Sequence, residues 1–474
     1  MQEKKGMMEM KKKYLFTLTS IILSILALGS IIKLNMIPIK YLIIIILVLG
    51  IFLLLGNYLS YRKKRIPKVF GTILLLGLII GNVLIIYHVG NMNHFIDQSF
   101  KEKKQEKIKY YVVALHTNKF KKKDISGDLG YYEKSINVKE GIKVLEKKYE
   151  INDLKFDDIN NMFNKLDQEE MKFILIEKSS FNILMEVDSN RDENQYDIIL
   201  EFEITKDLKT ETSTEEEKFN IYVGGTDYVG LMDFNAVITV NTTTHKLLLT
   251  SIPRDYYVEV HGLDYKNKLS FITEGIDVSS NTIADLFDTK MDYYIKIDAD
   301  SVIKLINEIG GIEYCSDYEY NGSYSFVENG RRKTGSYWIK KGCQHLNGYQ
   351  AIAASRTRNS FNGRDRVRQQ NMQKIMIAIL QKLSSTENIN NYEVILGDLS
   401  DSYETNISKK IVTKNVKDML NNGNKWTIET QSVDGEDGQD TVHRFNDITD
   451  WVMYPNEETV ENASKRIKEV LKEK

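Results

Sequence analysis

The chain has 474 residues, enough for two or three domains, and its formal net charge of −2 excludes the global positive field that indicates nucleic-acid binding. It contains 2 cysteines and 7 histidines, which do not cluster at the spacing of a zinc site. No glycine-rich phosphate loop of the Walker type occurs either. Composition therefore argues against a nucleic-acid-binding protein, a zinc protein and a P-loop NTPase.

Residues 1–97 are predicted to form a membrane region. The runs 14–32, 41–57 and 69–89 are apolar, and each approaches the ~20 residues that cross a bilayer. Lysines precede the first run and basic residues fill the second loop, so the positive-inside bias places the N-terminus in the cytoplasm. A lysine cluster at 101–109 opposes this orientation, but three spans still put the rest of the chain outside. We expect a multi-pass cell-membrane protein.

A small accessory α/β domain is predicted over residues 98–205. Short β-rich runs at 110–114, 173–176 and 196–202 alternate there with charged helical stretches, and no catalytic constellation is visible. The polar segment 206–218 has the composition of a linker.

The last domain, predicted over residues 219–474, interleaves β-branched strands with helices. This pattern indicates an α/β sandwich with a mixed central β-sheet flanked by helices. The expected strands are 219–223, 235–241, 246–252 and 293–297, and the expected helices are 282–287, 301–309 and 348–355.

Three arginine groups recur in this domain. They are Ser251-Ile-Pro-Arg254-Asp255, Arg356-Thr-Arg358 and Arg364-Asp-Arg366-Val-Arg368. Guanidinium groups gathered from distant parts of one domain suit a phosphate-rich ligand, because their fork geometry matches phosphate oxygens. In a membrane-anchored domain, this pattern points to a lipid-linked phosphate substrate.

The helix after the third arginine group has a clear apolar face, formed by Met372, Ile375, Met376, Ile379, Leu380 and Leu383. Arg368 lies one turn before Met372 on that face, so its side chain is expected on the buried side near the helix N-terminus. The helix dipole disfavours a cation there, and a bound anion would resolve the conflict. The alternative is a surface arginine paired with Asp365.

Two aspartates flank a short glycine-containing loop between the first two strands of this domain. Asp227 and Asp233 could together hold Mg²⁺, which favours oxygen ligands and keeps phosphate oxygens in its shell. Each of them, taken alone, is also an ordinary turn or cap residue. Cys315 and Cys343 lie outside the cell on the expected topology, so we predict a disulfide that closes a loop of roughly 30 residues.

Taken together, these residues resemble the LytR-CpsA-Psr family from about residue 219 to the end of the chain. The matching pieces are Ser251–Asp255, Lys268, Asp292–Asp298, Ile309–Ile312, Leu346–Ala351, Arg356-x-Arg358 and Asp365-x-x-Arg368. The three spans and the accessory domain resemble the subgroup associated with capsule polysaccharide.

The resemblance implies a phosphotransferase of cell-envelope biogenesis. Such an enzyme takes a glycopolymer, a capsule polysaccharide or a teichoic-acid-like polymer, from a polyprenyl-pyrophosphate carrier and joins it to a peptidoglycan hydroxyl. The lipid chain would occupy an apolar tunnel between sheet and helices. The implied partners are the lipid-linked glycan, the peptidoglycan acceptor, the membrane and the polysaccharide assembly machinery, with no nucleic acid.

Residue by residue, the resemblance carries over as follows. Arg254, Arg356, Arg358 and Arg368 match pyrophosphate-binding arginines, and Asp227 and Asp233 match aspartates that bind magnesium or manganese. Gln373 matches a family glutamine, although the helix register leaves Gln369 or Gln370 open. The expected catalytic residues are Arg254 with Asp233 or Asp255 as the proton acceptor.

Two positions depart from the family pattern. Leu231 stands where an arginine is common, and Asn371 stands where a second helix arginine is common. Arg366 or Arg364 is the candidate that compensates. Two other functions use the same residues: a hydrolase of lipid-linked pyrophosphate, with water as the acceptor, and a non-catalytic module that binds lipid-linked glycan.

Overall fold

The structure, a computed structural model, describes most of the chain. The described residues are 2–100, 105–135, 137–187, 191–208, 217–227, 230–272, 274–328, 331–357, 364–383, 403–422, 426–443 and 447–474. They form two compact units. The membrane unit contains the N-terminal helices and the segment from residue 407 to 422, and the outer unit contains the other described residues.

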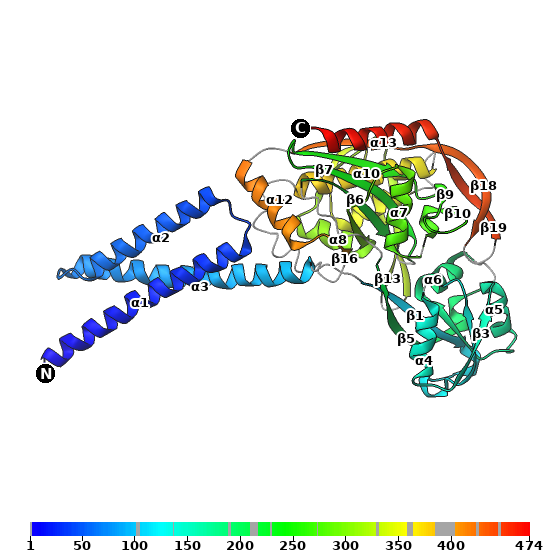
Figure 1. Cartoon of the computed structure of the whole chain (residues 1–474), viewed down its shortest axis with the longest axis horizontal. Helices are drawn as coiled ribbons and strands as arrows, with labels where there is room; N and C mark the ends of the chain where they lie inside the picture. Colours follow the sequence, from blue (N-terminus) through cyan, green and yellow to red (C-terminus); the bar gives the residue numbers. More distant parts are fainter. Residues whose placement is uncertain are drawn as a thin grey trace. The chain divides into compact units, whose positions relative to one another are not determined.

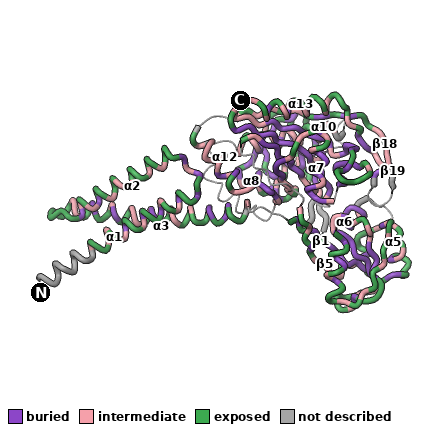
Figure 2. Tube along the Cα trace, in the orientation of Figure 1, coloured by how far each residue is buried: buried purple, intermediate pink, exposed green. Residues whose placement is uncertain are grey.

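Three long helices form most of the membrane unit: α1 (Gln2–Leu34), α2 (Ile39–Ser60) and α3 (Arg65–Ser99). Each contains a stretch long and apolar enough to cross a membrane, which confirms the three predicted spans. Much of their surface is exposed in this unit (Figure 2), as lipid-facing helices require. Asn82 donates a 2.8 Å hydrogen bond to Ser24 between α3 and α1. Such polar contacts hold helices together where water is absent.

A fourth helix, α12 (Lys409–Asn422), belongs to the membrane unit although it lies far along the sequence. Its Val412 and Val416 pack against apolar residues at the ends of α1 and α3. Lys409 forms a 2.6 Å ion pair with Asp97 on α3. The sequence pattern predicts this segment as part of the C-terminal domain, over residues 219–474. The structure differs because the apolar stripe of α12 is buried against the membrane helices and not against the sheet.

The accessory domain is a five-stranded sheet with helices on both faces, in the strand order β3-β2-β4-β1-β5. Its elements are β1 (Gln105–Leu115), β2 (Gly127–Tyr132), α4 (Val138–Glu146), β3 (Ile151–Phe156), α5 (Ile159–Asp167), β4 (Phe173–Glu177), α6 (Lys178–Val187) and β5 (Tyr196–Asp207). Alternating residues of β1 enter two cores: Tyr110 and Val112 face α4, while Tyr111 and Val113 face α5 and α6. The last strand ends at Asp207, two residues beyond the predicted boundary.

The C-terminal domain is built on a mixed six-stranded sheet, as the sequence predicts. Its strand order is β16-β11-β6-β7-β8-β17. The strands are β6 (Lys218–Thr226), β7 (Met232–Asn241), β8 (Lys246–Ile252), β11 (Tyr293–Asp298), β16 (Tyr403–Thr405) and β17 (Thr427–Ser432) (Figure 1). β6 pairs parallel with β11 and antiparallel with β7, and β8 pairs antiparallel with β7 and parallel with β17.

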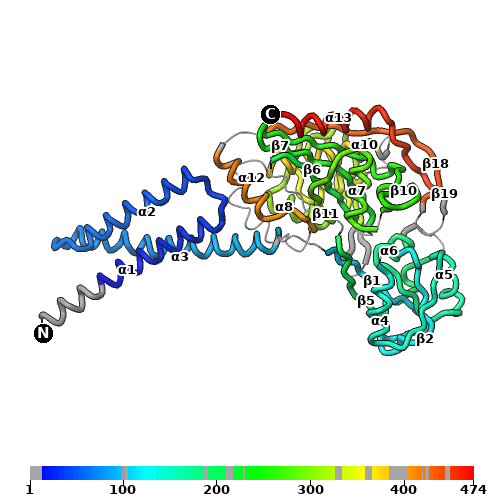
Figure 3. Tube along the Cα trace, viewed as in Figure 1, coloured from blue at the N-terminus to red at the C-terminus, as the bar shows by residue number. Residues whose placement is uncertain are grey.

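Helices cover both faces of this sheet. On one face, α7 (Ile276–Leu286) and α13 (Glu457–Lys472) pack against Tyr222, Val237 and Leu248. Figure 3 shows the red helix α13 beside the green strand β7. The other face carries α8 (Ala299–Glu308), α9 (Gly348–Arg356) and α10 (Arg364–Leu383). The groove described below lies between these three helices and the sheet.

Smaller elements complete the outer unit. Four short β-pairs are β9 (Tyr257–Glu259) with β10 (Lys266–Lys268), β12 (Ile312–Ser316) with β15 (Gly342–Leu346), β13 (Tyr320–Glu328) with β14 (Arg331–Ile339), and β18 (Gly435–His443) with β19 (Asp447–Pro455). Four 3-10 turns are His116–Asn118, Lys122–Asp124, Glu193–Gln195 and Leu269–Phe271. Cys315 of β12 lies directly opposite Cys343 of β15, and the two form the predicted disulfide.

The accessory and C-terminal domains share a hydrophobic core. Phe181 and Ile183 of α6 belong to the same buried cluster as Leu231 and Tyr257 of the C-terminal domain. Two buried or half-buried ion pairs reinforce the contact: Lys206 with Asp277 at 2.7 Å, and Lys296 with Glu106 at 2.7 Å. The accessory domain is therefore packed against the C-terminal domain, and the linker predicted from composition does not separate the two bodies.

Candidate anion-binding site

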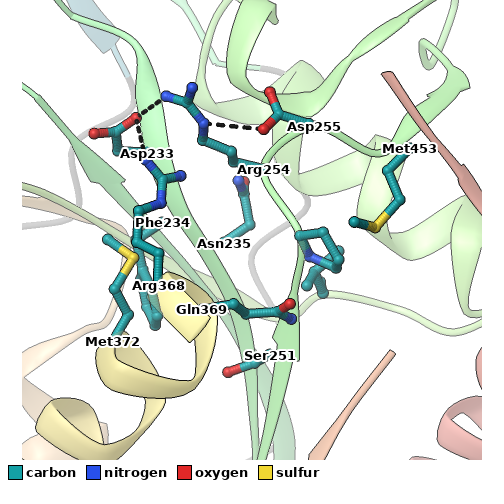
Figure 4. A pocket seen from close by; sticks show the side chains of 12 residues that line it. Asp233, Phe234, Asn235, Ser251, Arg254, Asp255, Arg368, Gln369, Met372 and Met453 are labelled. Atoms are coloured by element: carbon teal, nitrogen blue, oxygen red, sulfur yellow. Dashed lines mark hydrogen bonds and ion pairs between the residues drawn. The ribbon is translucent and has the colours of Figure 1, made fainter. Parts of the chain in front are cut away.

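Four separate elements bring arginines and aspartates to one edge of the C-terminal sheet. Arg254 follows the end of β8 and Pro253, Arg356 is the last residue of α9, and Arg368 lies in the second turn of α10. Figure 4 shows Arg254 and Arg368 both pointing toward Asp233 of β7. Residues more than a hundred positions apart in sequence therefore meet at a single carboxylate.

Asp233 owes its position to a β-bulge. In the β6–β7 pair, Gly225 lies opposite Phe234 and Thr226 opposite Met232, so Asp233 is the extra residue of β7. A bulge re-aims one side chain out of the regular alternation, and such bulges are frequent beside active sites. Asn235 donates a 3.3 Å hydrogen bond to the Met232 carbonyl, and the buried Tyr222 hydroxyl donates to Asn235 at 2.6 Å.

The Asp233 carboxylate contacts three guanidinium groups. Its Oδ1 accepts a hydrogen bond from Arg254 Nη1 and lies 3.8 Å from Arg368 Nη1, while its Oδ2 accepts from Arg356 Nη2 at 2.7 Å. Asp233 and Arg368 are both buried. Three guanidinium groups therefore share one buried carboxylate, and their planar N–H forks match the several negative oxygens of a phosphate ligand.

Two further carboxylates hold the outer sides of this cluster. Asp227 Oδ2 lies 3.4 Å from Arg356 Nη2, and its Oδ1 accepts the backbone N–H groups of Gly230 and Leu231 at 2.9 Å each. Asp255 accepts from Arg254 Nε at 3.2 Å. Asp227 thus closes its own turn with one oxygen and faces the cluster with the other. It is both the turn residue and the site-facing carboxylate that the sequence offers as alternatives.

Several buried donors beside the cluster have no acceptor among the described residues. They are Arg356 Nη1, Gln369 Nε2 and the Ser251 hydroxyl. A buried donor left unsatisfied costs about 1–3 kcal/mol. A cavity of about 20 Å³ lies between Arg254, Arg368, Gln369 and Ser251, enough for a water molecule. The orphaned guanidinium N–H group is the feature that points most directly to an anionic ligand.

An apolar groove of about 80 Å³ starts at the same cluster. Its walls are Phe234 and Ile297 of the sheet and Ile352 of α9, and its floor is the apolar face of α10. The predicted helix face is confirmed, since Met372, Ile375, Met376 and Ile379 all line the groove. Asp227, Asp233 and Arg356 stand at its polar end, so the groove leads directly into the charged cluster.

Two of the predicted pyrophosphate ligands lie elsewhere. Arg366 binds Asp434 at 2.9 Å, Asp437 at 3.3 Å and the Gly435 carbonyl at 2.7 Å, so it anchors α10 to the loop after β17. Gln373 donates to the Gln431 carbonyl at 3.0 Å. Successive residues of a helix are rotated by about 100°. Arg366, two residues before Arg368, therefore faces nearly the opposite side of α10.

The structure offers a replacement for the predicted glutamine, because Gln369 lines the cavity next to Arg368. The sequence alone does not decide between Gln369, Gln370 and Gln373 for this role. Arg358 lies outside the described residues, as do the side chains of Arg364 and Asp365. Asn371 is buried, and its side-chain oxygen accepts a hydrogen bond from the Tyr314 hydroxyl at 2.9 Å, so it serves the packing of α10 against β12.

The carboxylates of the cluster supply part of the ligand shell that a divalent cation needs. No group of three or more metal-ligating side chains occurs within the described ranges. Carboxylate oxygens of Asp227 and Asp233 nevertheless converge on one cationic atom, Arg356 Nη2, at 3.4 and 2.7 Å. A hard cation such as Mg²⁺ prefers this oxygen chemistry and completes its shell with water or phosphate oxygens. Two protein ligands are enough for such an ion when the substrate supplies the others.

Comparison with known proteins identifies the architecture. A model of the LytR_cpsA_psr family matches residues 159–469, about two thirds of the chain. The chain belongs to the LytR_cpsA_psr family. The match begins within the accessory domain and spans the whole charged cluster and the groove.

Individual relatives are distant. The chain is 27% identical over 217 residues to the polyisoprenyl-teichoic acid–peptidoglycan teichoic acid transferase TagU of Bacillus cereus, covering 45% of this chain and 68% of TagU. It is also 27% identical over 210 residues to biofilm regulatory protein A of Streptococcus mutans, covering 41% of this chain and about half (51%) of that relative. The crystal structure of B. subtilis TagV, 24% identical, covers 55% of this chain and 100% of TagV with a TM-score of 0.45.

Leu231 is the position at which the sequence resemblance implies an arginine. Leu231 is buried in the cluster that joins the accessory domain to the C-terminal domain, together with Phe181 and Ile183. An arginine here would place an unpaired charge in an apolar core, which is strongly unfavourable. The accessory domain therefore occupies the space toward which a longer polar side chain at this position would extend.

The shared carboxylate gives a direct test. Asp233→Asn keeps the side-chain volume but removes the charge that three arginines surround. We expect the variant to be destabilised by about 3–5 kcal/mol, because the guanidinium groups lose their buried counter-charge. Millimolar inorganic pyrophosphate should recover much of this loss in a thermal unfolding assay.

Asp437→Asn is the matched control, since it removes a carboxylate from an exposed arginine pair at Arg366. It should change stability by less than about 1 kcal/mol and gain nothing specific from pyrophosphate. Equal behaviour of the two variants would contradict the idea that the cluster around Asp233 is built for an anion.

Proposed function

We propose that this protein transfers a glycopolymer from a polyprenyl-pyrophosphate carrier to a peptidoglycan hydroxyl, forming a phosphodiester. The polymer would be a capsule polysaccharide or a teichoic-acid-like chain. The observation that carries this proposal is the junction of an arginine cluster with an apolar groove at Asp227, Asp233 and Arg356. A lipid pyrophosphate has the same sequence of chemistry: an apolar chain attached directly to a dense anion.

The family and the membrane helices support the same reading. TagU, which shares 27% identity over 217 residues, is named as a transferase of polyisoprenyl-linked teichoic acid to peptidoglycan. A lipid-linked substrate and an enzyme with three membrane helices are confined to the same bilayer, which raises their encounter rate. The basic residues before the first apolar span and between the second and third spans favour a cytoplasmic N-terminus, so the outer unit would face the cell wall.

In the bound state, we expect pyrophosphate oxygens to replace carboxylates as partners of the arginines. Arg254, Arg356 and Arg368 would turn from Asp233 to the phosphates, and the free N–H of Arg356 would gain an acceptor. The lipid would extend along α10 in the apolar groove. This groove is narrow at about 80 Å³, so α10 would have to shift outward to admit a polyprenyl chain.

The chemical step needs little covalent chemistry from the protein. The acceptor hydroxyl oxygen attacks the phosphorus beside the sugar, the new O–P bond forms, and the bridging P–O bond breaks with release of polyprenyl phosphate. The hydroxyl proton passes to Asp233 or Asp255, the two carboxylates that touch Arg254. The arginines stabilise the charge that grows on the phosphoryl oxygens and on the leaving phosphate.

Magnesium, or manganese, is the cofactor that this site would hold. Asp227 Oδ2 and the Asp233 carboxylate are its expected protein ligands, and the remaining ligands would be pyrophosphate oxygens and water. When bound, the ion neutralises phosphate charge and favours departure of the leaving group. Arg356 would then be available to the pyrophosphate, because Asp227 and Asp233 would hold the cation.

Arg254→Ala tests the proposal at its centre. We expect the variant to lose transfer by about 10²–10³-fold, because it removes a guanidinium aimed at the charge of the transition state. Arg366→Ala is the matched control, since Arg366 is bound to the β17–β18 loop outside the cluster, and it should retain most of the activity. The assay is mass spectrometry after incubation with Mg²⁺, a polyprenyl-pyrophosphate oligosaccharide and peptidoglycan fragments.

The products of that assay separate the alternatives. A glycan–phosphate–peptidoglycan adduct that disappears in Arg254→Ala supports the transferase. Free sugar phosphate without an adduct supports a hydrolase with the same cradle. Lipid that binds and stays intact supports a non-catalytic module of a polysaccharide assembly system. Wild-type turnover by Arg254→Ala contradicts the assignment of this arginine.

Metal dependence follows from the two aspartates. Chelation with EDTA should abolish transfer, and added Mg²⁺ should restore it. Asp227→Asn keeps the oxygen that accepts the Gly230 and Leu231 N–H groups but lowers the charge at the metal position. The Mg²⁺ concentration for half-maximal activity should rise roughly tenfold or more in this variant. An unchanged Mg²⁺ dependence would remove Asp227 from the metal site.

A further inference from the structure

A polar cleft of about 280 Å³ lies where the accessory domain meets the C-terminal domain. This volume is far above the ~10–15 Å³ that a single water molecule needs. The accessory wall comes from β1, with Glu106 and Lys107, and from α6, with Lys178, Ser179 and Asn182. The opposite wall contains Thr226, Asp227, Gly230, Ser279, Lys296 and Asp298.

The cleft opens onto the charged cluster. Thr226, Asp227 and Asp298 line both this cleft and the apolar groove. Asp227 also contacts Arg356 of the cluster at 3.4 Å. The apolar groove, the arginine cluster and the polar cleft therefore meet around Asp227. A ligand made of lipid, pyrophosphate and sugar combines these three chemistries.

The charges that line the cleft are balanced. Its ionisable lining residues are four acids (Glu106, Glu177, Asp227 and Asp298) and four lysines (Lys107, Lys109, Lys178 and Lys296). The hydroxyl and amide groups of Thr226, Ser179, Ser279 and Asn182 lie among them. A balanced mixture of donors and acceptors suits a neutral, hydroxyl-rich molecule better than a phosphate polymer.

The two walls are held rigidly together. Glu106 is buried and spans the boundary, accepting from Lys296 Nζ at 2.7 Å and from the Ile276 N–H at 3.3 Å. Burial alone would lower the pKa of Lys296, but Glu106 and neighbouring carboxylates outweigh it and raise that pKa, so the lysine stays charged. Gly230 has φ +98°, and an added Cβ would lie 3.2 Å from Ser179 Cβ. This glycine lets α6 approach the loop that carries Asp227.

From these observations we propose that the accessory domain completes a carbohydrate subsite beside the pyrophosphate cluster. The proposal rests on the transfer function proposed above and adds the surface that receives a sugar. The sugar belongs either to the first residue of the lipid-linked donor or to the peptidoglycan acceptor. In both cases, the hydroxyl groups would bond to Asn182, Ser179 and the neighbouring charged side chains.

The test uses the full-length protein in lipid nanodiscs and measures binding. The probes are farnesyl pyrophosphate, a polyprenyl-pyrophosphate-linked N-acetylglucosamine and a soluble peptidoglycan disaccharide. Asn182→Leu removes both hydrogen-bonding groups while keeping the same branched arrangement of heavy atoms, and Asn182→Tyr fills the cleft. Asn161→Leu is the matched control, because Asn161 is exposed on α5 and lies outside the cleft lining.

We expect a sugar-bearing probe to lose roughly fivefold to tenfold in affinity in both Asn182 variants and to keep its affinity in Asn161→Leu. Loss for the lipid-linked sugar assigns the cleft to the donor, and loss for the disaccharide assigns it to the acceptor. Unchanged affinity of both sugar probes in both Asn182 variants overturns the proposal. Farnesyl pyrophosphate reports on the arginine cluster and the apolar groove but carries no sugar for the cleft. Its failure to bind the wild-type protein would contradict the proposed function, while the disaccharide still decides the cleft.

Discussion

One buried carboxylate organises the outer unit of this protein. Asp233 contacts Arg254, Arg356 and Arg368, which come from β8, α9 and α10, so a single charge ties three elements to the bulge in β7. Such cations are costly to bury without a partner, and Asp227 and Asp255 supplement Asp233 at Arg356 and Arg254. The ligand-free arrangement is thus held together by a counter-charge that a pyrophosphate can replace, which links stability directly to binding.

The accessory domain also contributes to the structure around this site. It packs against the C-terminal domain through Phe181 and Leu231, which belong to one buried apolar cluster. The same contact fixes α6 next to the Asp227 loop and so creates the polar cleft. The domain that the sequence leaves without a role therefore forms one wall of the region where the sugar would lie.

The sequence predicts the features that depend on local pattern. The apolar period of α10 correctly places Arg368 on the inner face, because Arg368 is four residues before Met372. The same rule already disfavours Arg366, which is two residues from Arg368 and points to Asp434. The bulge at Asp233 is not predictable, because it depends on the pairing of β7 with β6. Nor is the position of α12, since its apolar stripe fits a sheet or a helix bundle equally well.

The central claim is that the cluster at Asp233 binds the pyrophosphate of a lipid carrier. A crystal structure of the outer region with Mg²⁺ and a short-chain polyprenyl pyrophosphate tests it most directly. The account predicts phosphate oxygens about 2.7–2.9 Å from the guanidinium nitrogens of Arg254, Arg356 and Arg368, with the lipid along α10. Phosphates bound elsewhere, with all three arginines still paired to Asp233, would contradict it.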